Sequence, residues 1–256
     1  MIHIKPPYTL FAQVYDRTMN DIPYHHWAYF LFQIFEEHKI CQKDWVVDIG
    51  AGTGIVASKL NSYYNLISLD NSSHMLKKAS RSQELKCIQA DMQNLPFLED
   101  KISAAYSTHD CLNYLTTDRE FHNHLSEVYR ILKPGGIYIF DYSTEYNVLQ
   151  NFKNKVFRER HGNYRMVWTN TYNEQEQMVT SIIDVTEYMP FWAGFLLFWK
   201  NKKFREIHRQ KIFSEINLDE FYTKTGFELI EKNYDYKGKK PDHRAQILVY
   251  ILRKPG

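Results

Sequence analysis

Val46-Val-Asp-Ile-Gly-Ala-Gly-Thr-Gly54 decides the fold. The apolar run at 45–49 predicts a short buried strand, and the pattern at 54–61 predicts a helix soon after it. The chain has only 10 glycines in 256 residues, so three of them between a strand and a helix indicate a turn that requires bare backbone. A turn of this kind brings the backbone close to a bound nucleotide or nucleoside.

Strands and helices continue to alternate on both sides of this turn. The remaining helices are predicted at 24–38, 72–80, 119–132 and 218–225, and the remaining strands at 66–69, 86–89, 102–107, 136–142, 227–230 and 245–252. Such alternation indicates a parallel sheet covered on both faces by helices. From about 145 to 213 the pattern changes to aromatic-rich, strand-like patches. We therefore expect one α/β domain with an inserted antiparallel subdomain.

The bulk composition mainly excludes functions. The 32 basic and 30 acidic residues leave a net charge of +2, so we expect no broad cationic face and no nucleic-acid partner, although a local basic patch stays open. Three cysteines form neither a disulfide framework nor a zinc site, which favours no metal and a cytoplasmic location. The longest apolar stretch, 189–199, is far shorter than the ~20 residues that span a bilayer.

Two acidic residues restrict the class of ligand that the glycine turn can bind. Asp70 lies 20 residues after Gly50, at the end of the second predicted strand, where a carboxylate can accept hydrogen bonds from ribose hydroxyls. Ile55 stands where a dinucleotide fingerprint requires a small residue, and Asp48 would repel a pyrophosphate. A nicotinamide-dependent oxidoreductase is therefore the unlikely alternative. Asp48 could also serve only to cap a turn.

Two further motifs complete an ordered set. Asp91 and Met92 follow the third predicted strand, where they can contact an adenine, and Leu132-Lys-Pro-Gly-Gly136 ends a helix before a new strand. Together with 48–54 and Asp70, these motifs resemble the class I S-adenosylmethionine-dependent methyltransferases. The resemblance implies a Rossmann-like, seven-stranded, mostly parallel sheet with helices on both faces and an inserted antiparallel β lid.

The flanks resemble a small-molecule subgroup of that family, which includes bacterial methyltransferases of unassigned substrate and amino-sugar N-methyltransferases. The segments 11–16 and 21–27 and the Glu206-Ile-His208 element of the lid carry this resemblance. It implies four parts: a cofactor-covering helical segment at 1–44, a cofactor-binding core at 45–145, a lid at 146–213, and core-completing elements at 214–256.

The resemblance also implies roles for individual residues around S-adenosylmethionine. Tyr15 would close over the cofactor and Trp27 would pack beside it, although both could simply pack into the core. The remaining cofactor contacts would be Asp48, Gly50, Ala51, Gly52 and Thr108 at the methionine end, Asp70 at the ribose, and Asp91 and Met92 at the adenine.

Methyl transfer needs an in-line nucleophile about 3 Å from the methyl carbon, and a base only where the acceptor must lose a proton. The candidate catalytic residues are Tyr114, where some amino-sugar relatives carry a histidine, and His208 on the lid, with His109 and Asp110 in reserve. Tyrosine, with a pKa of ~10, is a poor base at neutral pH. A lone histidine on a strand is more often structural.

The sequence leaves the acceptor open. Only 8 of the 40 aromatic residues lie in 41–137, which favours an aromatic-lined pocket for a small molecule methylated at N or O. The alternative is a non-catalytic module that binds a partner through the lid, and the chain could be a monomer or a homodimer. The segment 190–205 could pack on its own domain, wall the acceptor pocket, form a dimer contact, or contact an anionic membrane peripherally.

Overall fold

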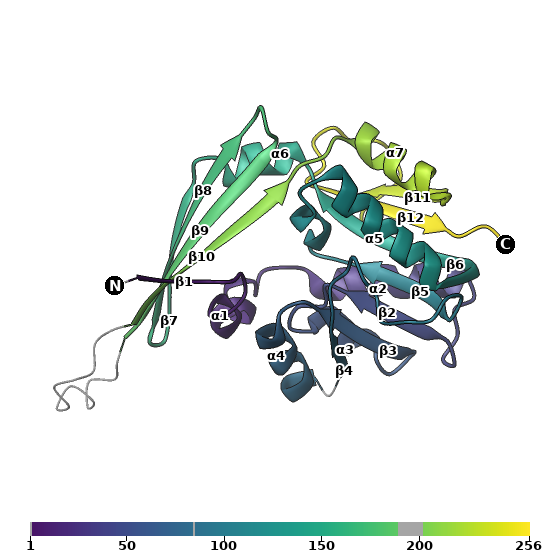
Figure 1. Ribbon diagram of the computed structural model, residues 1–256, viewed down its shortest axis with the longest axis horizontal. Coiled ribbons are helices and arrows are strands. Elements are labelled where there is room, and N and C mark those ends of the chain that lie inside the picture. The colour runs from purple at the N-terminus through teal and green to yellow at the C-terminus, as the bar shows by residue number, and fades with distance from the viewer. Residues whose placement is uncertain (1, 84, 189–201) are drawn as a thin grey trace.

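Two sheets organise the protein. The computed structural model describes residues 2–83, 85–188 and 202–256. Figure 1 shows a helix-flanked core sheet and a second sheet that projects from one end of it. The segment 190–205 falls largely outside the described residues, since 189–201 are not among them.

The core sheet has seven strands in the order β11-β12-β6-β5-β2-β3-β4. The strands are β2 (Trp45–Ile49), β3 (Asn65–Asp70), β4 (Lys86–Gln89), β5 (Ile102–Ser107), β6 (Leu132–Ser143), β11 (Glu228–Tyr234) and β12 (Ile247–Arg253). All pairings from β6 to β4 are parallel, whereas β12 runs antiparallel to both of its neighbours. The expected Rossmann-like, mostly parallel sheet of seven strands is confirmed.

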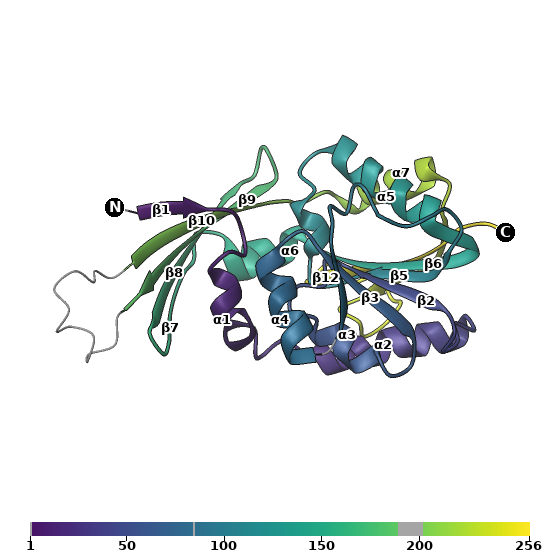
Figure 2. The ribbon, with the colours of Figure 1, turned by 60° about the horizontal axis from the view of Figure 1, so that its bottom comes forward.

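Helices cover both faces of this sheet (Figure 2). One face carries α2 (Tyr24–Glu37), α3 (Ile55–Leu60) and α4 (Ser73–Gln83), and the other carries α5 (Asp118–Ile131) and α7 (Glu215–Thr225). Because neighbouring residues of a strand point to opposite faces, Ile137 and Ile139 pack with α2 while Tyr138 and Phe140 pack with α5. Burial on both faces explains why these strands are continuous apolar runs.

The second sheet, called the lid sheet here, has the order β1-β10-β9-β8-β7. Its strands are β1 (Ile2–Lys5), β7 (Val156–His161), β8 (Tyr164–Asn173), β9 (Met178–Glu187) and β10 (Lys202–Lys211). Strands β7 to β10 are antiparallel, as expected for the insertion. Strand β1 adds to β10 in parallel, a pairing that the sequence did not predict.

Helix α1 (Phe11–Thr18) lies under the inner face of the lid sheet. Its residues Phe11 and Val14 are buried against Met166, Ile183 and Val185 of β8 and β9. Two short elements lead from β6 of the core to β7 of the lid sheet: α6 (Glu145–Asn147) and the π-helical turn η2 (Val148–Phe152). A third, η1 (Cys111–Tyr114), lies between β5 and α5 and is hydrogen-bonded through Asn113 to β6 and β10. None of the helices in the described ranges is long and apolar enough to cross a membrane.

Gly54 shows why the turn after β2 uses glycine. It precedes α3 with a φ of +75°, a left-handed conformation that residues with a Cβ adopt at a cost. A Cβ at this position would lie 2.4 Å from Cδ1 of Leu85 and 3.2 Å from Cβ of Ala79. The glycine therefore allows α3 to approach α4 closely.

Gly54→Ala should destabilise the protein by more than Gly135→Ala. Gly135 has a nearly equal φ of +79°, but a Cβ there meets no atom within 4 Å. Both variants carry the backbone strain, and only Gly54→Ala adds overpacking, which costs ~1–3 kcal/mol. Urea unfolding followed by circular dichroism measures the difference. Equal midpoints for the two variants would contradict the steric explanation.

Candidate active site

A cavity of about 550 Å³ opens at the carboxyl ends of β2 to β5. In an open α/β sheet this edge is where ligands bind. Nine of the ten residues expected around the cofactor line it: Tyr15, Asp48, Gly50, Ala51, Gly52, Asp70, Asp91, Met92 and Thr108. Trp27 does not line this cavity. We call this space the first cavity.

Asp70 organises the rim of the first cavity. The backbone N–H of Gly52 donates to Oδ2 of Asp70 over 2.8 Å, and the N–H of Ser72 donates to Oδ1 over 2.7 Å. The carboxylate thus links the glycine turn to the start of α4. Burial raises the pKa of Asp70, while these two backbone hydrogen bonds oppose the shift.

Asp48 presents an unpaired acid to the same cavity. Its side chain is 2% exposed, and Oδ1 has no hydrogen-bond partner. Burial raises the pKa of Asp48 to about 8; the hydroxyl of Tyr106 opposes the shift, and the nearby negative charge of Asp70 adds to it. A buried carboxyl oxygen without a partner costs free energy unless a ligand supplies the partner. The site is therefore suited to a ligand with a cationic group at this point.

The loop that carries Asp91 and Met92 is held from below by His124. Burial lowers the pKa of His124 to about 4, so the ring is neutral at pH 7. Its Nδ1 lies 3.0 Å from the carbonyl oxygen of Met92, and its Nε2 lies 2.7 Å from the hydroxyl of Tyr138. The Met92 carbonyl can only accept, so Nδ1 carries the proton and Nε2 accepts from Tyr138.

A second cavity, of about 810 Å³, lies between the core and the inner face of the lid sheet. Aromatic and aliphatic side chains such as Trp27, Phe157 and Trp168 line much of it. Trp27 packs in a stacked arrangement on the ring of Tyr236. The two cavities share four lining residues: Tyr8, Tyr15, His109 and Tyr114. The two cavities are therefore adjacent, and these four side chains form the boundary between them.

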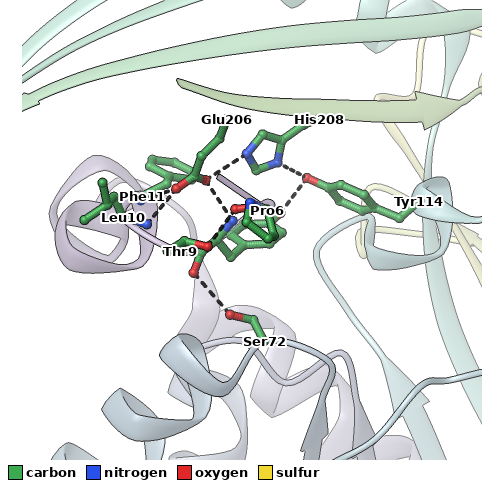
Figure 3. A network of polar contacts seen from close by, with 9 residues as sticks. Pro6, Thr9, Leu10, Phe11, Ser72, Tyr114, Glu206 and His208 are labelled. Carbon is green, nitrogen blue, oxygen red and sulfur yellow. Dashed lines mark hydrogen bonds and ion pairs between the residues drawn. The ribbon is translucent and has the colours of Figure 1, made fainter. Parts of the chain in front are cut away.

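A chain of hydrogen bonds runs from this boundary into the lid. The hydroxyls of Tyr8 and Tyr114 are 2.7 Å apart, and the Tyr114 hydroxyl lies 2.8 Å from Nδ1 of His208 (Figure 3). Nε2 of His208 lies 3.2 Å from Oε2 of Glu206. Burial raises the pKa of Tyr114 well above its usual value, so the phenol stays protonated at neutral pH. The two candidate catalytic residues, Tyr114 and His208, thus contact each other.

Glu206 also fixes the N-terminal segment. Its fully buried carboxylate accepts from the N–H of Tyr8 over 2.8 Å, of Leu10 over 2.6 Å and of Phe11 over 3.1 Å. Leu10, the residue before α1, has no polar side chain that could cap the helix. Glu206 on β10 therefore supplies the acceptor for the free N–H groups at the start of α1. Figure 3 shows these contacts to Leu10 and Phe11, and they fix the segment from which Tyr8 and Tyr15 line the first cavity.

His109 and Asp110 form a strained corner at the boundary. Their φ values are +63° and +50°, a conformation that residues other than glycine adopt at a cost of order 1–3 kcal/mol. Their N–H groups each donate over 2.7 Å to the buried carboxylate of Asp141, which also accepts from the hydroxyl of Tyr236. The corner aims Asp110 into the second cavity, where Nε2 of Gln210 donates to it over 2.9 Å.

The ionisation of this corner is set by burial. Burial lowers the pKa of His109, so its ring is neutral at pH 7. The hydroxyls of Tyr15 and Tyr24 lie 2.9 and 3.3 Å from its Nδ1. Burial raises the pKa of Asp110 to about 6, while the hydrogen bond from Gln210 opposes the shift. Asp110 is therefore mainly a carboxylate at pH 7 and an acid below pH 6.

Comparison with known proteins agrees with this geometry. The family described as Methyltransferase domain matches residues 46–136. The putative methyltransferase YqeM of Bacillus subtilis is 26% identical over 252 residues, which is 96% of this chain and 97% of that protein. A crystal structure of an S-adenosylmethionine-dependent methyltransferase from Clostridium acetobutylicum has a TM-score of 0.80 at 23% identity, and the match covers 97% of this chain and 99% of that one.

Residues 46–136 therefore form a methyltransferase domain, and the chain as a whole is similar to S-adenosylmethionine-dependent methyltransferases. A second similar structure is CalS10, an amino pentose methyltransferase from Micromonospora echinaspora with S-adenosylmethionine bound, with a TM-score of 0.68 at 14% identity over 94% of this chain and 97% of that one. The expected family and cofactor are confirmed, and the nicotinamide alternative falls away. The first cavity fits this cofactor, since the unpaired Asp48 oxygen can receive its ammonium group.

Sequence reasoning missed several residues of this methyltransferase site. Tyr8 has a left-handed φ of +58° and links both cavities, yet nothing around it in the sequence indicates this role. Tyr24 and Asp141 were also missed. Of these residues, Asp141 is the one that the sequence could have indicated. It is an acid inside an apolar strand, and a buried charge of this kind needs a hydrogen-bond or ionic partner.

Binding of S-adenosylhomocysteine to the methyltransferase should release protons at pH 7. Asp48 is mainly protonated at that pH because its pKa is raised to about 8. An ammonium group beside it favours the carboxylate, so about one proton leaves on binding. Calorimetric titration in buffers of different ionisation enthalpy measures this number. Asp48→Asn should release almost none, and proton release equal to that of the parent would contradict the assignment.

Glu206→Gln should loosen the N-terminal segment. The variant loses the charge and one of the two acceptor oxygens that hold three N–H groups, and a hydrogen bond to a charged group contributes ~1.5–3 kcal/mol. We expect the amides of 8–11 to exchange with deuterium roughly tenfold or more faster. Mass spectrometry of peptides measures the rates. Glu176→Gln, in an exposed turn of the same sheet, is the control and should leave these amides unchanged.

Proposed function

We propose that this methyltransferase transfers a methyl group from S-adenosylmethionine to an amine nitrogen of a small molecule held in the second cavity. The observation that carries the proposal is the shared boundary: Tyr8, Tyr15, His109 and Tyr114 line both cavities. An acceptor in the second cavity therefore meets the open end of the first. A cavity of about 810 Å³ is of the size that encloses a drug-sized molecule.

The acid Asp110 supports a nitrogen acceptor. It reaches the second cavity from the strained corner beside His109, and only Gln210 donates to its side chain among the hydrogen bonds of the described residues. A carboxylate in a largely apolar cavity favours a cationic partner. An ammonium group bound there can transfer its proton to Asp110, whose pKa is about 6. The transfer is only partial, but it generates the neutral amine that attacks.

Each part of the first cavity then has a proposed role. Asp48 pairs with the ammonium group of the cofactor and Asp70 accepts from its ribose, while Asp91 and Met92 border the adenine. Gly50, Ala51, Gly52 and Thr108 border the methionine end. When bound, S-adenosylmethionine supplies an electrophilic methyl group, and the nitrogen lone pair forms the new N–C bond as the S–C electron pair returns to sulfur.

In this proposal Tyr114 and His208 orient the acceptor and do not act as the general base. We infer the directions of their hydrogen bonds from Glu206: a carboxylate can only accept, so Nε2–H of His208 donates to it and Nδ1 accepts from the Tyr114 O–H. This direction leaves the Tyr114 oxygen as an acceptor at the boundary of the cavities, where Tyr8 lies 2.7 Å away. The chain holds both phenols over the reacting groups, so that water is excluded while the acceptor is oriented.

A methyl-transfer assay over a panel of small amines, alcohols and phenols tests the proposal. For an amine substrate, kcat/KM should rise about tenfold per pH unit below pH 6 and level off above it, because the Asp110 carboxylate is the binding form. Asp110→Asn should lower kcat/KM by roughly 10²-fold or more and remove the dependence near pH 6.

Glu159→Gln is the matched control, since Glu159 also lines the second cavity but is paired with His161. It should keep the change near pH 6. Methylation of hydroxyls alone would contradict the nitrogen acceptor. Binding of S-adenosylhomocysteine without turnover of any acceptor would favour a non-catalytic module that holds a partner under the lid.

A further inference from the structure

The outer face of the lid sheet concentrates basic side chains. Alternate residues of β7 to β10 point inward, as the burial of Val179, Ser181, Ile183 and Val185 shows. The strand register places the residues between them on the other side. Seven of these outward residues are basic: Arg158, Arg160, Arg165, Lys203, Arg205, Arg209 and Lys211. We call this surface the basic face.

Acids do not balance this charge. Among the outward strand residues that the structure describes, the one acid is Asp184, and its carboxylate already binds Nε and Nη2 of Arg205 over 2.7 and 2.8 Å. The whole chain has a net charge of only +2. Basic residues are therefore concentrated on this one face, and the basic face does not simply reflect a basic overall composition.

The arrangement opposes the stability of the sheet. Arg160 stands directly opposite Arg165 in the pairing of β7 with β8, and Lys203 follows two strands away in the same row, with Thr186 between them. Like charges that face each other across strands destabilise a sheet. An arrangement with this cost indicates a partner that neutralises it.

Aliphatic side chains complete the surface. Ile2 and Ile4 of β1 lie on this side, 47% and 71% exposed, together with Ile207 and Val156. Figures 1 and 2 show no described helix over this side of the sheet, because α1 lies under the other side. No helix of the described residues thus covers the basic face, on which basic and aliphatic side chains lie together.

We propose that the basic face docks on an anionic lipid bilayer. Basic residues attract anionic headgroups and aliphatic side chains enter the headgroup region, with no need for a shaped partner. None of the outward-facing strand residues described is aromatic, whereas single-stranded nucleic acids and protein hot spots rely on aromatic contacts. The aromatic residues Phe157, Tyr164 and Trp168 alternate to the inner side. The proposal does not depend on the identity of the acceptor.

Co-sedimentation of the full chain with vesicles tests this assignment. Vesicles of phosphatidylcholine with phosphatidylserine should bind the protein, pure phosphatidylcholine vesicles should not, and added salt should weaken binding. The double variant Arg160→Glu with Arg165→Glu should lower the partition coefficient tenfold or more. The matched control, Lys77→Glu with Lys101→Glu, reverses two exposed charges on the core and should bind at least fivefold better than the double variant.

Binding of S-adenosylhomocysteine verifies that both double variants are folded. Equal binding to neutral vesicles, no binding to either vesicle, or full binding by the Arg160 and Arg165 variant would each overturn the proposal. Binding of a single-stranded RNA homopolymer that is lost in this variant, without vesicle binding, would assign the face to nucleic acid instead.

Discussion

The carboxylate of Glu206 is the contact on which the rest of the site depends. It accepts from three N–H groups of the N-terminal segment and lies beside His208 in the same lid strand. A single buried acid thereby places the cover of the first cavity and the wall of the second. Removal of the whole carboxyl group would leave three N–H groups of the N-terminal segment without their acceptor, a larger loss than that of any one contact.

A second buried acid does the same for the opposite wall. Asp141, near the end of β6 in the core sheet, compensates the strained backbone of His109 and Asp110 with two hydrogen bonds. Glu206 and Asp141 thus position the two sides of the boundary between the cavities from separate sheets. Their separation means that the geometry at the boundary depends on how the lid sheet is docked on the core, through the N-terminal segment that lies between them.

Local signals made the core sheet predictable. The local sequence predicts the buried strands and the glycine turn at 50–54, because each depends on residues only a few positions apart. Strand β1 carries no such pattern, because its four residues are exposed and its partner lies about 200 residues away. The contacts of Tyr8 and Glu206 depend on that pairing and were equally hidden. Gly54 adds a different lesson, since it serves the packing of α3 against Leu85 and Ala79.

The parallel pairing of β1 with β10 sets the order in which the protein can be completed. The segment 8–15, which lines the first cavity, is made before Glu206 and His208, which follow it by about 190 residues. Closing so long a loop is entropically costly and gains its contacts late. The core sheet also needs β12, near the end of the chain, beside β6. Strand β1 therefore waits for β10, and a product that ends before β10 lacks both the contacts that fix the N-terminal segment and one wall of the second cavity.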